Sequence, residues 1–255
     1  MTEQRFACTA CGACCYGVLP LTVSEALAWA DTFPLAISIT PVRPGARGYS
    51  SLRHLGVDVA FGPRRTMSLL VSPVSFIPPN MACPKLSPEN LCSIHETKPE
   101  RCRTMPFLGY KDEDSQRDLL VPRPGWKCDT GPGAPVVYRD QKIVDRTAFA
   151  SERGAMKTQA PRLQAFVDFL LKYDPASSAR IARAAQAPQI GRVMVGFVSF
   201  LRQDRNLDII EFAKRQRPVL AAWLERTADD PKLAQFTNYY REAFADLQRY
   251  IDRPA

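Results

Sequence analysis

Hydrophobic positions in the second half of the chain recur every three or four residues, the spacing of one helix face. The clearest stripe runs over Leu163–Leu171, and Pro161 stands where the first turn of a helix tolerates proline. The same periodicity predicts further helices over Ser177–Gln186, Ile190–Arg202, Leu207–Arg226 and Pro231–Tyr250. We expect their apolar stripes, which include Trp223, Tyr239 and Tyr240, to form a helix-packing core.

The first half of the chain has shorter apolar runs. Leu21–Phe33 has the pattern of a short amphipathic helix, and either Thr22 or Ser24 can cap its beginning. Two runs with the composition of β-strands follow, Leu35–Val42 and Met67–Ile77. We expect these two runs to pair as a small antiparallel sheet.

Composition divides the chain near residue 135. Most of the 22 prolines and all eight cysteines stand before that point. Because proline favours loops and short elements, the first half should be irregular. The sequence therefore predicts an α+β fold in two domains. Residues 1–135 would form a cysteine-rich metal-binding domain with a small antiparallel sheet, and residues 136–255 a helical region packed on it.

Charge and hydropathy narrow the setting. The net charge of +8 is spread over both halves, so it permits an acidic protein partner and gives no reason to expect nucleic acid. The polar segment Met1–Phe6 does not resemble a signal peptide. The most apolar stretch, Ala187–Leu201, is short for a membrane span and contains Arg192, so we expect a buried helix there. These features predict a cytoplasmic protein, in which clustered cysteines indicate metal or redox chemistry.

The strongest chemical signal is a group of cysteines near the start of the chain: Cys8, Cys11, Cys14 and Cys15. A spacing of two residues lets successive thiolates face one metal centre across a tight turn, and Gly12 suits such a turn. Three cysteines at this spacing with a distant Cys-Pro, here Cys83-Pro84, are typical of cubane iron–sulfur clusters. Because adjacent side chains point apart, we expect one of Cys14 and Cys15 to serve a second centre or to act as a redox thiol.

A second group of cysteines follows after a long gap: Cys83, Cys92, Cys102 and Cys128. Arg101 and Arg103 flank Cys102 and would offset the negative charge that four thiolates leave on Zn²⁺ or on a [4Fe–4S] cluster. Solvated surface charge is the alternative interpretation of these arginines. His95 follows Cys92 at a spacing that can bind zinc, but a single histidine is weak support, and His54 has no cysteine nearby.

Two spaced motifs resemble a known family. FxCxxCGxCC at Phe6–Cys15 and CPxLxxxxxCxIHxxxPxxCRxxPF at Cys83–Phe107 look like the bacterial cysteine-cluster family named for its CxxCxxCC motif, a zinc- or iron-chelating domain. The resemblance covers the cysteine-rich half and implies that the cysteines chelate metal. It extends in part to flagellin lysine N-methylases, which makes S-adenosylmethionine a candidate ligand. His95 stands where many members carry tyrosine.

Three functional interpretations follow. An iron–sulfur protein with a [4Fe–4S] cluster in a redox or accessory role is favoured, because a dense cysteine triplet is closer to the cubane pattern than to paired zinc knuckles. The alternatives are a zinc-stabilised module that binds a protein partner and a protein lysine methyltransferase resembling flagellin N-methylase. The eight thiolates would form two four-ligand sites, or one cluster with a structural remainder. Since metal binding also supplies folding energy, metal removal should unfold residues 1–135.

Overall fold

The computed structural model describes residues 3–45, 49–60, 66–187, 191–204 and 206–252. Its main sheet is antiparallel throughout, with the strand order β2 (Leu19–Pro20), β5 (Thr66–Ser75), β3 (Leu35–Val42) and β8 (Val193–Gly196). A short strand, β4 (Val57–Ala60), pairs with the opposite end of β5 from β2. The predicted pairing of the two strand-like runs is confirmed, from Leu35 opposite Ser75 to Val42 opposite Ser68.

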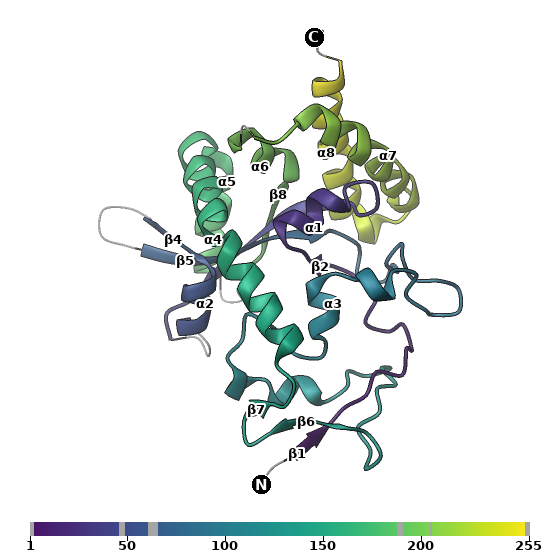
Figure 1. Ribbon diagram of the computed structural model, residues 1–255. Helices are drawn as coiled ribbons and strands as arrows, with labels where there is room; N and C mark the ends of the chain where they lie inside the picture. The colour runs from purple at the N-terminus through teal and green to yellow at the C-terminus, as the bar shows by residue number, and fades with distance from the viewer. Residues whose placement is uncertain (1–2, 46–48, 61–65, 188–190, 205, 253–255) are drawn as a thin grey trace.

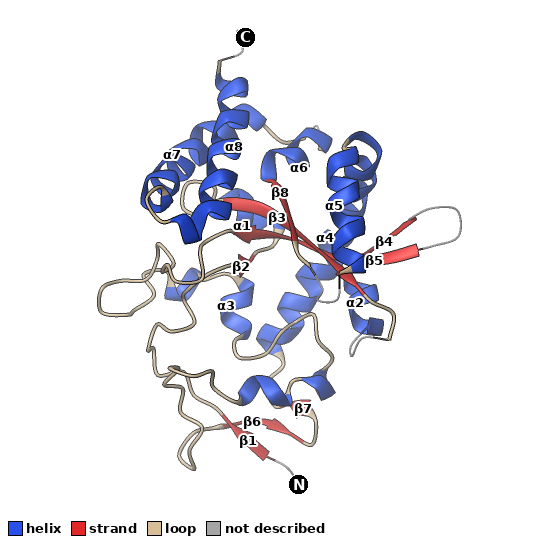
Figure 2. Ribbon diagram, turned by 180° about the vertical axis from the view of Figure 1, so that it is seen from behind, coloured by secondary structure: helices blue, strands red, loops and turns tan. Residues whose placement is uncertain are grey.

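A second, smaller sheet lies at the other end of the molecule (Figures 1 and 2). It consists of β1 (Glu3–Arg5), β6 (Val136–Arg139) and β7 (Lys142–Ile143), in that order and antiparallel. The register shifts between Gln4 and Arg5, where Val137 of β6 is the extra residue, unpaired with β1. The first strand of the chain is therefore held by a segment more than a hundred residues later in the sequence.

The helices are mostly in the second half of the chain and confirm the α+β class. They are α1 (Val23–Ala28), α2 (Tyr49–Leu55), α3 (Glu100–Thr104), α4 (Thr147–Tyr173), α5 (Pro175–Gln186), α6 (Phe197–Gln203), α7 (Ile209–Thr227) and α8 (Ala234–Ile251). Figure 1 shows α5–α8 gathered on the side of the main sheet that faces away from the small sheet, while α4 runs from one sheet toward the other. Within the described residues, no helix combines the length and apolar character that a bilayer crossing needs.

Three sequence predictions require correction. The predicted helix Ile190–Arg202 is instead β8 followed by α6, because Val193 and Val195 alternate inward beside β3 before the helix begins; residue 190 lies outside the described residues. Pro161 lies inside α4 rather than in a first turn, because the helix begins at Thr147. The helix predicted over Leu21–Phe33 is shorter and ends at Ala28; of the two predicted caps, Thr22 is the one that the structure confirms.

The main sheet is fixed to the C-terminal helices by buried polar contacts. Tyr239 and Tyr240 donate their hydroxyls to the carbonyls of Leu35 and Phe76, each over 2.6 Å. Tyr240 is fully buried, which confirms the predicted core role of this helix face. Backbone pairing of β1 with β6 and of β3 with β8 crosses the predicted domain boundary at residue 135, so both halves of the sequence contribute to each sheet.

Candidate metal centre

The cysteine-bearing segments lie between two hydrophobic cores. The main core surrounds the large sheet, and the smaller one gathers Phe6, Phe107, Leu120, Tyr138, Ile143 and Phe149. Cys83 packs against the main core, whereas Cys128 packs against the small one. In Figure 1 the N-terminal segment, in purple, runs from the small sheet to β2 beside the loops that carry the later cysteines. Metal-ligating side chains here would join the two cores.

Backbone pairing ties the start of the cysteine motif to Cys128. Ala7 and Asp129 form an isolated antiparallel bridge, and the two N···O distances between their amides and carbonyls are 2.7 and 3.0 Å. Cys8 directly follows Ala7, and Cys128 directly precedes Asp129, so the backbones of the two cysteines are neighbours. This proximity joins cysteines that are 120 positions apart, and the spacing of the motif did not indicate it.

The thiol of Cys11 lies beside the segment that carries Cys128. Hydrogen bonds from the backbone at Lys127 and Ala13 lower the pKa of Cys11, and its thiolate repels that of Cys128. Thr9 adds a further connection by donating its hydroxyl to the Lys127 carbonyl over 2.8 Å. Backbone N–H groups directed at sulfur favour the thiolate, the form that binds metal.

A second set of cysteines is organised around Cys15. The carbonyl of Cys15 accepts a hydrogen bond from the amide of Cys83 over 2.7 Å. The chain then turns, with the amide of Leu86 bound to the carbonyl of Cys83 over 3.0 Å, and Leu86 pairs with Cys92 as an antiparallel bridge. Backbone hydrogen bonds thus link the segment of Cys15 to that of Cys83, and a turn and a bridge link Cys83 to Cys92.

Cys102 reaches this set from α3. Glu25 joins the beginnings of α1 and α3, because its carboxylate accepts from the amide of Glu100 over 2.7 Å and from that of Thr22 over 2.8 Å. Burial raises the pKa of Cys102 to about 12, and repulsion from the Cys83 thiolate adds to the rise. The half-buried thiol of Cys102 therefore lies beside Cys83, in a setting where a positive metal centre would remove the cost of ionising it.

The adjacent pair Cys14 and Cys15 has the most perturbed thiols. A hydrogen bond from the thiol of Cys15 lowers the pKa of Cys14 to about 6, and the charge of Lys98 contributes in the same direction. The same hydrogen bond raises the pKa of Cys15. The thiolate of Cys14 also interacts electrostatically with cysteines of both sets, namely Cys11, Cys128, Cys15, Cys83 and Cys102. Cys14 thus lies where the two sets meet.

A close approach at Gly12 brings the first cysteine loop against the loop before Cys92. Gly12 has φ +72°, and Asn90 has φ +62°. A Cβ at Gly12 would lie 3.0 Å from both Cβ and Oδ1 of Asn90, so glycine is required for both conformation and space. The turn predicted from the CxxCGxCC spacing therefore exists, and its glycine also permits contact between the two cysteine groups.

The flanking arginines have definite partners. Arg101 is buried and forms an ion pair with Glu152 of α4, while it still attracts the Cys102 thiolate. Arg103 donates from Nε to the carbonyl of Lys98 over 2.9 Å and so holds the loop before α3. Their predicted role, offsetting the charge of a metal–thiolate centre, stays a prediction.

The described residues contain no group of three or more His, Cys, Asp or Glu side chains already arranged to hold one ion. The donor set nevertheless fits a thiophilic metal, because all eight cysteines are free thiols and none is fully buried. Both histidines are exposed, His54 on α2 and His95 on the 3₁₀ turn His95–Thr97. The candidate ligands are therefore sulfur atoms, with Cys102 on α3 and the others outside the helices.

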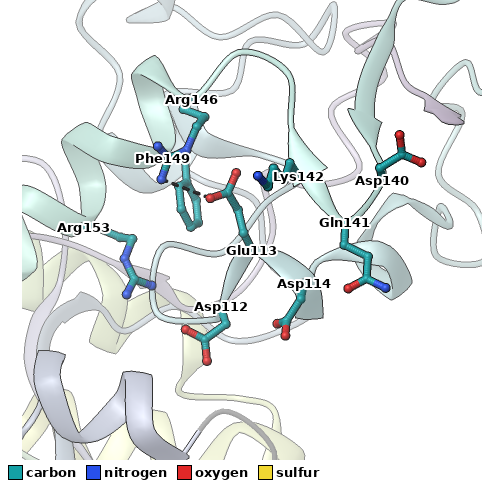
Figure 3. A pocket seen from close by; sticks show the side chains of 9 residues that line it. All are labelled: Asp112, Glu113, Asp114, Asp140, Gln141, Lys142, Arg146, Phe149 and Arg153. Carbon is teal, nitrogen blue, oxygen red and sulfur yellow. Dashed lines mark ion pairs between the residues drawn. The ribbon is translucent and has the colours of Figure 1, made fainter. Parts of the chain in front are cut away.

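A separate pocket beside the small sheet is lined by Asp112, Glu113, Asp114, Asp140, Gln141, Lys142, Arg146, Phe149 and Arg153 (Figure 3). Glu113 points toward Arg146, and their charged atoms are 3.0 Å apart. Asp112 binds the hydroxyl of Ser51. These carboxylates are already engaged by neighbouring groups, and the pocket contains no cysteine.

Sequence reasoning missed three residues that shape the cysteine region: Lys98, Asn90 and Glu152. Asn90 gave a usable signal, because asparagine in a Pro-Glu-Asn turn often takes positive φ. Lys98 was visible only as one more basic residue. Glu152 gave no signal in the sequence, since its partner Arg101 stands 51 positions earlier.

Comparison with known proteins supports the chemistry of the site. Residues 7–122 match the family model CxxCxxCC, described as "Putative zinc- or iron-chelating domain". Residues 7–122 are therefore similar to this domain, as the two motifs indicated, and a metal-binding role is supported. Cys128 lies beyond the matched residues. Neither a curated protein nor a solved structure gives a significant match to the chain.

Proposed function

We propose that this protein binds iron through its cysteines as an iron–sulfur centre of the [4Fe–4S] kind and acts in electron transfer or as an accessory to a protein partner. One observation carries the proposal. Backbone contacts bring Cys8 beside Cys128 and Cys15 beside Cys83, so cysteines of both sequence groups are neighbours. Thiolates are the ligands of such clusters, and four are needed for each.

The surroundings of the sulfurs suit a negatively charged centre. Four thiolates around a [4Fe–4S]²⁺ cluster carry a net charge of about −2. Lys98 and Arg101 interact favourably with the thiolates of Cys14 and Cys102, and backbone N–H groups bond to Cys11. Hydrogen bonds and nearby cations of this type offset the charge and adjust the reduction potential.

Exposure supports a role that involves contact with another molecule. Cys8 and Cys14 are exposed, whereas the other six cysteines are half-buried. A centre that reaches the surface can exchange electrons with a docked protein, and the basic character of the chain (+8) favours an acidic partner. A reducing, cytoplasmic setting would keep all eight thiols available for metal.

Zinc is the second candidate, because the same thiolates can bind Zn²⁺ tetrahedrally and the family description names both metals. A zinc-loaded chain would use its cysteine region as a scaffold that presents a surface to a partner. Iron is favoured because Cys8, Cys11 and Cys14 follow the spacing of cubane-binding loops rather than that of two CxxC knuckles.

The deciding experiment is purification of the full chain without oxygen, followed by an absorption spectrum and analysis of iron, zinc and acid-labile sulfide. A brown protein with iron and sulfide in about equal amounts is the expected result. A colourless protein that holds only zinc would overturn the iron proposal. Titration of the same preparation with S-adenosylmethionine tests the methyltransferase alternative, which tight, saturable binding would favour.

A further inference from the structure

We propose that the eight cysteines form two separate centres of four thiolates each, divided between the adjacent residues Cys14 and Cys15. Centre A comprises Cys8, Cys11, Cys14 and Cys128, and centre B comprises Cys15, Cys83, Cys92 and Cys102. The inference rests on the metal-binding part of the proposed function, but it holds for either iron–sulfur or zinc, because both take four thiolates.

Backbone geometry defines three members of centre A. The bridge between Ala7 and Asp129 places Cys8 beside Cys128, with N···O distances of 2.7 and 3.0 Å. Cys11 lies beside the same segment, because its thiol is hydrogen-bonded to the backbone of Lys127. Electrostatic repulsion of the Cys128 thiolate by those of Cys11 and Cys8 supports this grouping. Centre A therefore includes a ligand, Cys128, that lies outside the matched family domain.

Backbone geometry also defines centre B. The amide of Cys83 binds the carbonyl of Cys15 over 2.7 Å, and the turn at Leu86 brings Cys92 back toward Cys83. Cys102 joins the set from α3, whose first residue is bound by Glu25 of α1 over 2.7 Å, and its thiolate interacts most strongly with that of Cys83. These four thiols come from three parts of the chain and make a full ligand set without Cys14.

Ligand number then assigns Cys14. Centre B already has four thiolates, whereas centre A has three without Cys14, and the spacing of two residues continues from Cys8 through Cys11 to Cys14. Cys14 interacts electrostatically with cysteines of both sets, so ligand number and spacing decide its assignment. A single pair of adjacent cysteines thus divides between two neighbouring centres, which explains the Cys-Cys step in the motif.

The two centres differ in burial. Centre A contains both exposed cysteines, Cys8 and Cys14. All four thiols of centre B are half-buried, and Cys83 packs against the main core. A chelator reaches exposed ligands first, so the metal of centre A should leave faster than that of centre B.

The test measures metal content in single variants of the full chain, purified without oxygen. Cys128→Ser and Cys14→Ser should each lose about half of the bound metal, and Cys92→Ser and Cys15→Ser should lose the other half. Combining Cys128→Ser with Cys14→Ser should cause no further loss, because both act on centre A. Combining Cys128→Ser with Cys92→Ser should remove nearly all metal. Additive loss within one centre, or complete loss in every single variant, would overturn the division.

A second measurement on the unaltered protein avoids variants that fail to fold. Release of metal to an excess of chelator should occur in two phases of about equal amplitude. A single phase, or metal sufficient for only one centre per chain, would overturn the inference while leaving the proposed function intact. Two zinc ions per chain would overturn the iron proposal and support the two centres. A chain that binds neither metal would overturn the proposed function itself.

Discussion

Arg101 and Glu152 form a buried ion pair that fastens the helix carrying Cys102 to the long helix α4. Nη1 of Arg101 lies 3.1 Å from Oε2 of Glu152, and both side chains are less than a tenth exposed. The same carboxylate accepts a hydrogen bond from the amide of Gly109 over 2.9 Å. One ligand-bearing helix is therefore positioned by a residue outside the cysteine-rich part of the sequence.

Substitution Glu152→Gln should destabilise the protein strongly. It leaves the Arg101 guanidinium buried without its counter-charge, and breaking such a pair costs about 3–5 kcal/mol. The free energy of unfolding from urea titration measures the effect. Glu3→Gln is a matched control, since Glu3 pairs with Arg139 at the surface over 2.8 Å and an exposed pair is worth at most about 1 kcal/mol. Equal losses in the two variants would show that the buried pair has no special role.

Substitution Gly12→Ala should weaken metal retention. Alanine at φ +72° is strained by about 1–2 kcal/mol, and its Cβ would meet Asn90 at 3.0 Å. Both effects displace the first cysteine loop from the second, so metal should leave faster to a chelator. Gly133→Ala is the control, because no atom lies within 4 Å of the added Cβ.

The double variant Gly12→Ala with Asn90→Gly separates the two effects. Glycine at position 90 removes the contact and accepts the positive φ of that residue. Partial recovery of metal retention is expected. If the double variant is no better than Gly12→Ala alone, backbone strain rather than contact between the loops is responsible.

The sequence predicted the elements whose patterns are local. The strand β3 was predicted at its observed bounds because a run of apolar and β-branched residues favours a buried strand. The cap of α1 was predictable for the same reason, since Thr22 and Glu25 form a capping box within four residues. The eight candidate ligands were also visible, because cysteine spacing is a local property.

Long-range partners were not predictable from the same patterns. The proximity of Cys8 to Cys128 depends on a backbone bridge between distant segments, and the Arg101–Glu152 pair joins two helices. Val193 and Val195 belong to a strand only because β3 offers a free edge to pair with. A helical period and a short strand cannot be told apart there without knowing the neighbour.

Gln216→Leu should destabilise the protein without reducing its metal content in the folded state. Gln216 is 1% exposed, accepts from the amide of Leu35 over 2.7 Å and donates to the carbonyls of Ala30 and Phe33. Leucine would leave these buried backbone groups without partners, at about 1–3 kcal/mol for each group. Urea titration and metal analysis of the folded variant test both parts of the prediction.

The control for this variant is Gln164→Leu. Gln164 has a similar pattern of bonds, to the amide of Asp58 over 3.0 Å and to its carbonyl over 2.9 Å, but the contact is exposed. Water can replace the lost bonds there, so the change should be within about 0.5 kcal/mol. A loss at Gln216 as small as that at Gln164 would contradict the assignment of Gln216 to a buried clamp.

Metal removal should unfold less of the chain than the sequence alone predicts. Residues 1–135 include β3 and β5, yet these strands are held by C-terminal helices through Tyr239, Tyr240 and other core residues. The cysteine loops and the small sheet have no comparable apolar support, since their own core is small. Because metal binding supplies folding energy to loops of this kind, chelation should release them and leave the main sheet folded.

Hydrogen exchange of backbone amides, measured before and after chelation, distinguishes these outcomes. Protection should fall in the segments around Cys8, Cys92 and Cys128, where local opening no longer requires dissociation of metal. The amides of β3 and β5 should keep their protection, because they pair with each other over eight residue pairs. Loss of protection in β3 would mean that the sheet depends on the metal after all. Unchanged exchange in the cysteine loops would mean that metal is not what holds them between the two cores.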